Sequence, residues 1–304
     1  TLSGGLSRSR SRYLHGTYME IFVAKSSGFC FGVKRAINIA TDCAEHSRGG
    51  IYTLGPIIHN PQVVKRLEQS HVYEKSDVDE IETGTVIIRS HGARLDEYKR
   101  AKEKGLAVVD ATCPFVKKAQ YIVSLLSSEG YVVVVAGEKD HHEVKGLVSY
   151  GASGIRVADS PDAISDMPRC KKIGVVAQTT LPLERFEEIV SACLAKTAEL
   201  KVYNTICNAT SIRQKESAEL SRKVDCMIVV GGRNSANTRR LAEICRRIQP
   251  KTHHIEVADE LDPAWLGGAS TIGITSGAST PDWVIEAAVE RIMVIADNEQ
   301  KLRM

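Results

Sequence analysis

The sequence alternates between short apolar runs and helical segments along most of its length, and this alternation restricts the fold more than any other feature. Apolar runs such as TVIIRS, YVVVVAG and CMIVVGG are each followed by a polar loop and then by residues with helical spacing. Strands that alternate with helices are typical of parallel sheets, because a parallel crossover needs a long connection. We therefore expect an α/β fold.

A cysteine-led unit followed by two units with polar loops recurs three times. The steps from Cys30, Cys113 and Cys207 to the polar residue of the next loop are 59 − 30 = 29, 141 − 113 = 28 and 237 − 207 = 30 residues. This period predicts three similar small parallel-sheet domains in a pseudo-threefold, trefoil-like arrangement around a central cluster. The expected boundaries are residues 1–18 for a tag or disordered leader, 19–113 for a first domain whose initial strand could pair with the third, 114–206 and 207–304.

The N-terminal segment accounts for the whole net charge of +3. Residues 1–18 contain Arg8, Arg10 and Arg12 and no acidic residue, so the rest of the chain is neutral (+3 − 3 = 0). Ser-Arg repeats ahead of Met19 are typical of a tag remnant, with a transit-peptide fragment as the alternative, and we expect Met19 to be the native start.

Composition excludes two classes of partner. No apolar run approaches the roughly 20 residues that span a bilayer, so we expect no membrane segment. Aromatic residues make up 5% of the chain, which argues against a surface that stacks on nucleic-acid bases. Eight cysteines without a signal-peptide pattern suit a reducing, cytoplasmic compartment, where thiols bind metals more often than they form disulfides.

Three of the cysteines share one local setting. Cys30, Cys113 and Cys207 each open a helical segment, in GFCFGVKRAINIA, DATCPFVKKAQYIV and NTICNATSIRQKESAEL. The positive end of a helix dipole favours a thiolate over a thiol. Three such thiolates could hold an iron–sulfur cluster with one iron left open, whereas structural zinc sites normally show close ligand pairs such as C-x-x-C, which are absent here.

The remaining cysteines fit a structural role. Cys43, Cys193 and Cys245 fall inside helical patterns, and Cys226 lies in an apolar strand, so all four are expected in the core. Cys170 lies in a polar linker and could be either structural or reactive.

The polar loops that follow the strands are suited to an anion. Imidazoles and hydroxyls beside helix N-termini bind phosphate well, although each histidine alone could simply cap a loop. The chain has no GxxxxGK[ST] or GxGxxG motif, so neither ATP nor a dinucleotide is indicated. Glu143 is a candidate proton donor, with an ordinary surface carboxylate as the alternative. The candidate anion-binding residues are His59, His91, His141, Thr179, Ser235, Asn237 and Ser279.

With these motifs in view, the chain resembles the LytB-type iron–sulfur reductases, the 4-hydroxy-3-methylbut-2-enyl diphosphate reductases of the non-mevalonate isoprenoid pathway. The resemblance runs in family order from residue 28 to 283. It is carried by GFCFGVKRAI, LGPIIHNPQVV, IIRSHGA, DATCPFV, HHEVKG, QTTL, ICNAT, NSANTRRL and TSGASTPDW.

The resemblance implies both a reaction and a set of ligands. The reaction is the reductive dehydroxylation of the allylic diphosphate to isopentenyl and dimethylallyl diphosphates at a [4Fe–4S] cluster. Cys30, Cys113 and Cys207 would be the cluster ligands, while Glu143 and Thr179 would serve the substrate hydroxyl and its protonation. The diphosphate would be bound by His59, His91, His141, Ser235, Asn237 and Ser279.

Two positions depart from the family pattern. Where the family commonly has two serines before the asparagine, this chain has Ser235 and Ala236, so one hydroxyl is missing. The family's His-Pro-Glu is here His141-His142-Glu143, so His142 is a possible competitor for the role of His141.

The electron donor and the rival functions complete the expectations. Because no nicotinamide or flavin motif is visible, the resemblance implies a ferredoxin or flavodoxin as the donor, and we expect a monomer. The rivals are a metal-dependent hydrolase of a phosphorylated metabolite and a non-catalytic iron–sulfur sensor. A hydrolase would need no electron donor, and a sensor would usually carry a separate output domain.

Overall fold

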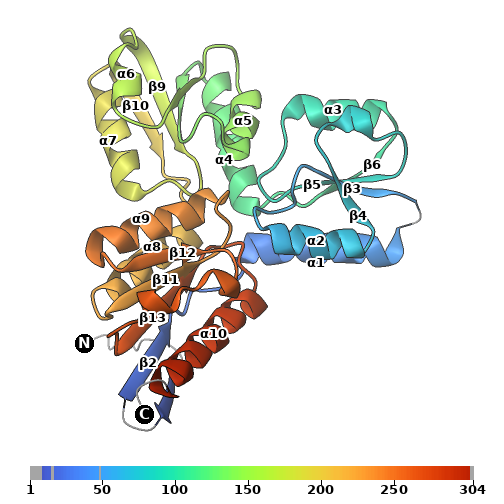
Figure 1. The fold of residues 1–304 in the computed structure, drawn as a ribbon. Helices are drawn as coiled ribbons and strands as arrows, with labels where there is room; N and C mark the ends of the chain where they lie inside the picture. Colours follow the sequence, from blue (N-terminus) through green and yellow to red (C-terminus); the bar gives the residue numbers. More distant parts are fainter. Residues whose placement is uncertain (1–8, 15–16, 48, 302–304) are drawn as a thin grey trace. The chain divides into compact units, whose positions relative to one another are not determined.

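The structure is a computed structural model that describes residues 9–14, 17–47 and 49–301. The chain divides into two compact units, each of which is described by itself (Figure 1). The two-sheet unit comprises Phe31–Ile58 and Gln62–Cys207. The one-sheet unit comprises the chain up to Cys30, the short segment His59–Pro61, and the chain from Asn208 onward. Among the described residues, no helix has the length and apolar content needed to cross a membrane.

The first sheet of the two-sheet unit has the strand order β4-β3-β5-β6, and all of its pairs are parallel. The central strand β5 is buried along its whole length, which explains its unbroken run of Thr, Val and Ile. The strands are β3 (Ile51–Leu54), β4 (Val72–Lys75), β5 (Thr85–Ile88) and β6 (Ala107–Asp110), and the helices are α1 (Phe31–His46), α2 (Pro61–Gln69), η1 (Val78–Glu80) and α3 (Leu95–Glu103).

The second sheet of this unit has the order β10-β9-β7-β8 and is also parallel throughout. Alternate residues of β9 enter two different cores: Val175 packs with α7 and Val176 packs with α4. Helices therefore cover both faces. The strands are β7 (Val132–Ala136), β8 (Arg156–Ala158), β9 (Cys170–Ala177) and β10 (Thr197–Tyr203), and the helices are α4 (Pro114–Ser128), α5 (His142–Ser149), α6 (Asp162–Ser165) and α7 (Leu183–Leu194).

The sheet of the one-sheet unit has the order β1-β2-β13-β11-β12. Its pairs are parallel except for the antiparallel pair of β1 and β2. Residues of β11 alternate between a core shared with α10 and a core shared with α8 and α9. The strands are β1 (Ser9–Leu14), β2 (Thr17–Val23), β11 (Cys226–Val230), β12 (Thr252–Ile255) and β13 (Thr271–Ser276), and the helices are α8 (Asn208–Ser221), α9 (Ala236–Ile248), η2 (Ala258–Glu260), η3 (Pro263–Trp265) and α10 (Asp282–Lys301).

Three parallel sheets flanked by helices confirm the predicted fold class. Ser9–Leu14, within the expected tag or disordered leader, forms an edge strand whose backbone hydrogen-bonds to β2. Residues 1–8, 15 and 16 of the expected leader lie outside the described residues. Strand β2 pairs with β13 from the other end of the chain, and the three domain boundaries stay a prediction.

Every candidate residue follows the carboxyl end of a strand. In the two-sheet unit, β5 leads to His91, β6 to Cys113, β7 to His141, β9 to Thr179 and β10 to Cys207. The corresponding positions after β2, β11 and β13 of the one-sheet unit hold Cys30, Ser235 and Ser279. Because the strands are parallel, these loops gather at one edge of each sheet, where open α/β sheets bind ligands.

Candidate active site

A buried carboxylate lies between two loops of the two-sheet unit. Glu143 is the second residue of α5 and its side chain is only 1% exposed. One carboxylate oxygen accepts a 2.6 Å hydrogen bond from the backbone N–H of Thr179, and the other accepts a 2.8 Å bond from the Thr179 hydroxyl. Burial raises the pKa of Glu143 to about 7, although the two bonds from Thr179 act in the opposite direction. The carboxyl can therefore hold or release a proton near neutral pH.

A hydrogen bond at the start of α5 determines which ring nitrogen of one candidate histidine carries the proton. His141 is the N-cap of this helix, and its Nδ1 accepts from the backbone N–H of Glu143 at 3.1 Å. A neutral imidazole with Nδ1 as acceptor carries its proton on Nε2, which can then donate to an anion. The ring of His91 lies edge-on to the ring of His141, with centroids 5.7 Å apart.

His142 and His141 have different positions. His142 is the first residue inside α5, so it does not make the cap contact of His141. Burial lowers the pKa of His142, and the nearby charges of Arg89 and Lys145 lower it further. The structure thus supports His141 as the histidine of this loop that is oriented beside Glu143.

Each of the three candidate ligand cysteines directly precedes a helix, as the sequence predicted: Cys30 precedes α1, Cys113 caps α4 and Cys207 precedes α8. Helix α4 has Pro114 at its first position and no acidic residue in its first turn, and the nearby carboxylate of Asp110 is paired with Lys117. The backbone N–H of Cys113 donates to Ser90 O at 2.9 Å, which joins this thiol to the loop of His91.

A close backbone approach surrounds the sulfur of Cys113. A Cβ atom at Gly32, in the first turn of α1, would lie 2.5 Å from the Cys113 Sγ. Only glycine leaves room for the sulfur there, so the thiol lies beside the N-terminal turns of both α1 and α4. Two positive helix ends near one sulfur favour the thiolate, which is the form that binds iron.

The backbones of the other two candidate thiols are hydrogen-bonded to loops that carry candidate residues. The N–H of Cys207 donates to Thr179 O at 3.0 Å, directly behind the hydroxyl that contacts Glu143. In the one-sheet unit, the N–H of Cys30 donates to Ala278 O at 3.0 Å, next to Ser279. Cys113 and Cys207 belong to the two-sheet unit and Cys30 to the one-sheet unit. Within each unit as described, no three Cys, His, Asp or Glu side chains come together as a complete metal site.

Three of the four cysteines expected in the core, Cys193, Cys226 and Cys245, are buried as predicted. The expectation is wrong for Cys43, which lies in the last turn of α1 and is only partly buried. Burial raises the pKa of Cys43 and Cys245, and it raises that of Cys193 and Cys226 to about 11, so these thiols stay neutral. Cys170, at the start of β9, is half-buried and donates to the carbonyl of Pro168 at 3.3 Å. No disulfide joins any of the eight cysteines, all of which are described.

The one-sheet unit brings together four candidate anion-binding residues. The Ser279 hydroxyl donates to His59 O at 3.1 Å, and a Cβ at Gly232 would lie 2.8 Å from the same carbonyl. The loop after β11 therefore packs directly on the segment of His59. Ser235 is the N-cap of α9, and its hydroxyl accepts from the N–H of Thr238 at 3.3 Å.

Asn237 is the most informative of these four residues. Its side chain is 5% exposed, and both amide atoms are buried without a hydrogen-bond partner in the described structure. Buried amides are nearly always satisfied, so this one has hydrogen-bonding capacity left for an ordered water or a polar ligand. A phosphoryl oxygen would satisfy the amide N–H groups.

The structure adds residues that the sequence analysis did not select. Arg89 is 7% exposed, and its Nε donates to Gly92 O at 3.3 Å across the turn that holds His91. Burial lowers the pKa of this guanidinium. Glu256, just after β12, accepts from the N–H of Arg233. The only available signal was a charged residue at the end of each apolar strand, in TVIIR and THHIE.

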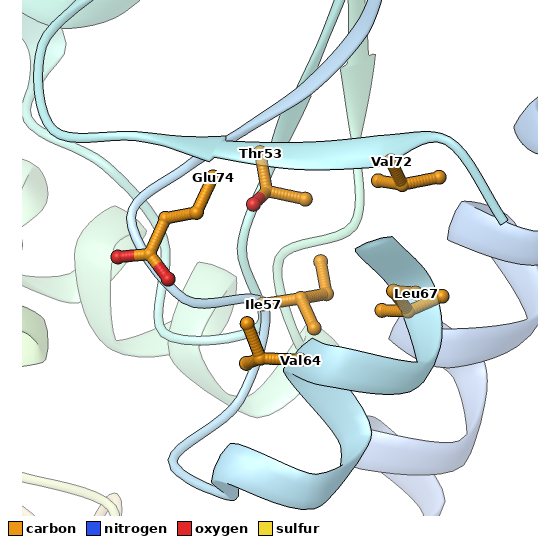
Figure 2. A pocket seen from close by; sticks show the side chains of 6 residues that line it. All are labelled: Thr53, Ile57, Val64, Leu67, Val72 and Glu74. Atoms are coloured by element: carbon orange, nitrogen blue, oxygen red, sulfur yellow. The ribbon is translucent and has the colours of Figure 1, made fainter. Parts of the chain in front are cut away.

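A small pocket lies elsewhere in the two-sheet unit (Figure 2). Its lining is mostly aliphatic and contains none of the candidate residues, so this pocket is a packing feature between α2 and the first sheet. It is lined by Thr53, Ile57, Val64, Leu67, Val72 and Glu74.

Comparison with known proteins shows the family of this chain. The family described as LytB protein matches residues 21–293, which include every candidate residue. The chain belongs to the LytB family. Two curated relatives of this LytB chain are 4-hydroxy-3-methylbut-2-enyl diphosphate reductases. The one from Pelobacter propionicus is 55% identical over 90% of this chain and 98% of the relative, and the one from Geobacter sulfurreducens is 54% identical over 93% and 100%.

Two solved structures resemble this LytB chain. One is described as the structure of (E)-4-hydroxy-3-methyl-but-2-enyl diphosphate reductase, the terminal enzyme of the non-mevalonate pathway. It has 47% sequence identity and a TM-score of 0.69, covering 90% of this chain and 98% of that one. The other is the E-1-hydroxy-2-methyl-but-2-enyl-4-diphosphate reductase from Plasmodium falciparum, with 28% identity and a TM-score of 0.84 over 89% and 86%.

The raised pKa of Glu143 predicts a pH-dependent effect on stability. Between its usual value of 4.5 and about 7, the unfolded chain loses the proton while the folded chain keeps it, so the free energy of unfolding falls as pH rises through this window. Glu143→Gln removes the charge. Relative to wild type, the variant should therefore gain up to about 3 kcal/mol between pH 5 and pH 8. Denaturant unfolding of both proteins at the two pH values measures this, and a pH-independent difference would contradict it.

Proposed function

We propose that this chain catalyses the reductive dehydroxylation of 4-hydroxy-3-methylbut-2-enyl diphosphate. In this reaction the allylic C–O bond breaks, two electrons and two protons are taken up, and water leaves with formation of isopentenyl or dimethylallyl diphosphate. One observation carries the proposal beyond the family match. The buried carboxyl of Glu143, with a pKa of about 7, is hydrogen-bonded to Thr179. The carbonyl of Thr179 in turn accepts a hydrogen bond from the N–H of Cys207. A proton donor thus lies near a candidate iron ligand.

Cys30, Cys113 and Cys207 would hold a [4Fe–4S] cluster. The fit is supported by the glycine that makes room for the Cys113 sulfur and by the helix start that follows each thiol. When bound, such a cluster would supply the electrons and a Lewis-acidic iron. No other thiol competes for it, since burial raises the pKa of Cys43, Cys193, Cys226 and Cys245, and Cys170 lies at the amino end of β9.

The diphosphate would be bound by hydrogen-bond donors of the candidate loops, which we describe for each unit by itself. Asn237 would supply its unsatisfied amide and Ser235 and Ser279 their hydroxyls. In the two-sheet unit, His141 would donate through Nε2, because its Nδ1 is already an acceptor. His91 and His59 complete the set. Hydrogen bonds to a charged acceptor are among the strong ones, so several of them can hold a diphosphate without lysine or arginine.

Glu143 would supply the proton for the leaving hydroxyl. Its carboxyl is half-protonated near neutral pH and is shielded from bulk water by its complete burial. In the structure the Thr179 hydroxyl donates to Glu143. When Glu143 is protonated this hydrogen bond would reverse, so that the carboxyl O–H donates to the Thr179 oxygen and the Thr179 hydroxyl donates to the substrate oxygen. The proton would then pass from Glu143 through Thr179 to the leaving hydroxyl.

The electrons would come from a ferredoxin or a flavodoxin, because the chain has no nicotinamide or flavin motif. We also propose that the enzyme acts as a monomer in the cytoplasm, in keeping with its reduced thiols.

Serine substitution of the three cysteines tests the cluster assignment. Cys30→Ser, Cys113→Ser and Cys207→Ser should each lose activity and most of the bound iron, because a serine hydroxyl does not ionise at neutral pH. Iron and sulfide analysis of anaerobically purified protein measures this. Cys170→Ser is the matched control and should keep the iron. Full iron content in all three variants would contradict the assignment of these cysteines as cluster ligands.

Glu143→Gln should separate binding from chemistry. The amide preserves the shape of the side chain but cannot donate a carboxyl proton, so turnover should fall by roughly 10²–10⁴-fold. Substrate affinity and cluster absorbance should stay close to those of wild type. Glu184, an exposed acid in the first turn of α7, provides the control Glu184→Gln, which should turn over normally. Near-normal turnover of Glu143→Gln would assign the proton to another group.

Asn237→Ala should weaken binding of the diphosphate by at least about tenfold, the value expected for a hydrogen bond to a charged group. Cluster absorbance should not change, since Asn237 is not a proposed ligand. Asn234→Ala changes an exposed residue of the same type in the same loop and should bind normally. His59→Ala and His141→Ala should resemble Asn237→Ala. If Asn237→Ala and Ser279→Ala bind normally while His59→Ala does not, the predicted third domain, residues 207–304, contributes no diphosphate ligand.

A further inference from the structure

The loop that ends at Ser235, just before Asn237 in the first turn of α9, is held in place by residues at the end of strand β12. This loop, residues 231–235, connects β11 to α9. The N–H of Gly231 donates to Ile255 O at 2.8 Å, and the Nε2 of His254 donates to Gly231 O at 2.8 Å. Both backbone polar groups of Gly231, its N–H and its C=O, are therefore held by β12.

The next contact is made by a carboxylate. One carboxylate oxygen of Glu256 accepts from the backbone N–H of Arg233 at 2.6 Å, and the other lies 3.4 Å from its guanidinium Nη1. Glu260 also binds the guanidinium of Arg233, with Nη1 at 3.1 Å. The side chains of Glu256 and Glu260 are 25% and 29% exposed, so they are partly shielded from water. The Arg233 charge is thus directed to these carboxylates.

The other side of the loop is fixed by packing that depends on two glycines. Gly231 has φ +144°, and a Cβ there would lie 2.4 Å from the hydroxyl oxygen of Thr280. Gly232 packs on the carbonyl of His59. Consecutive glycines give a backbone little stiffness of its own. The position of Ser235 therefore depends on contacts supplied by neighbouring segments.

We propose that Glu256 is a positioning residue for the diphosphate site. By holding the N–H of Arg233 it keeps Gly232 against the carbonyl of His59 and sets where α9 begins. It thereby places the Ser235 hydroxyl and the Asn237 amide for the substrate. The same carboxylate also lies beside the Arg233 guanidinium, which ties this side chain to the end of β12. This role rests on the proposed function, because it assumes that the loop binds a diphosphate.

The test compares three variants of the holoenzyme. Glu256→Ala removes the acceptor and should weaken binding of inorganic diphosphate by about tenfold or more, with an equal rise in substrate KM and an unchanged kcat. Glu256→Gln keeps an oxygen that accepts from the Arg233 N–H, so it should stay within about threefold of wild type. Glu260→Ala is the matched control. It removes a carboxylate from the same guanidinium but leaves the backbone bond, and it should also stay within about threefold of wild type. Calorimetry with inorganic diphosphate and steady-state kinetics give the two readouts.

The outcomes separate this role from the proposed function. If wild type does not bind inorganic diphosphate, the proposed function fails and this role falls with it. If wild type binds and Glu256→Ala binds equally well, only the positioning role is overturned. Equal losses in Glu256→Gln and Glu256→Ala would also overturn it, since the charge and not the hydrogen bond would then be responsible. If Glu256→Ala does not fold, Glu256→Asp decides: its shorter side chain should lose the contact and the affinity while it keeps the melting temperature.

Discussion

The parallel arrangement of the strands is the constraint on which the rest of this molecule depends. A parallel strand must be followed by a crossover, so each carboxyl end leads into a loop and then into the N-terminus of a helix. Those helix starts present unpaired backbone N–H groups and the positive end of the helix dipole at one edge of the sheet. Thiolates and diphosphate are both anions. The fold therefore provides the same electrostatic setting for the proposed iron ligands and for the proposed substrate.

Burial then sets the pKa and the hydrogen-bonding capacity of individual groups at this edge. Glu143 is almost completely enclosed, and the resulting loss of hydration raises its pKa to about 7 against the hydrogen bonds from Thr179. Asn237 is similarly enclosed, but its amide has no partner in the described structure. An unsatisfied buried amide costs about 1–3 kcal/mol. We infer that a polar ligand removes this cost when it hydrogen-bonds to the amide, which makes the free energy of binding more favourable.

Glycine residues allow backbone to approach the reactive groups closely enough for such contacts. Gly32 brings the first turn of α1 against the Cys113 sulfur, and Gly232 brings the loop of Ser235 against the carbonyl of His59. In both places a side chain of any size would separate the two segments. Glycine also makes the backbone more flexible. In the loop before Ser235, the hydrogen bonds of Glu256 and His254 restrict this flexibility.

Local patterns in the sequence determined the fold class, the helix start after each of the three cysteines, and the core positions of Cys193 and Cys226. These features depend on residues that are neighbours in the chain, through strand periodicity and helix capping. Tertiary structure alone decided that Ser9–Leu14 forms an edge strand, that Glu143 contacts Thr179, and that Glu256 holds the loop of Ser235. Glu143 and Thr179 are separated by 36 residues, and Glu256 is separated from Arg233 by 23. The folded backbone sets which of their loops meet and how much water remains between them, and the spacing of residues along a chain carries no record of either.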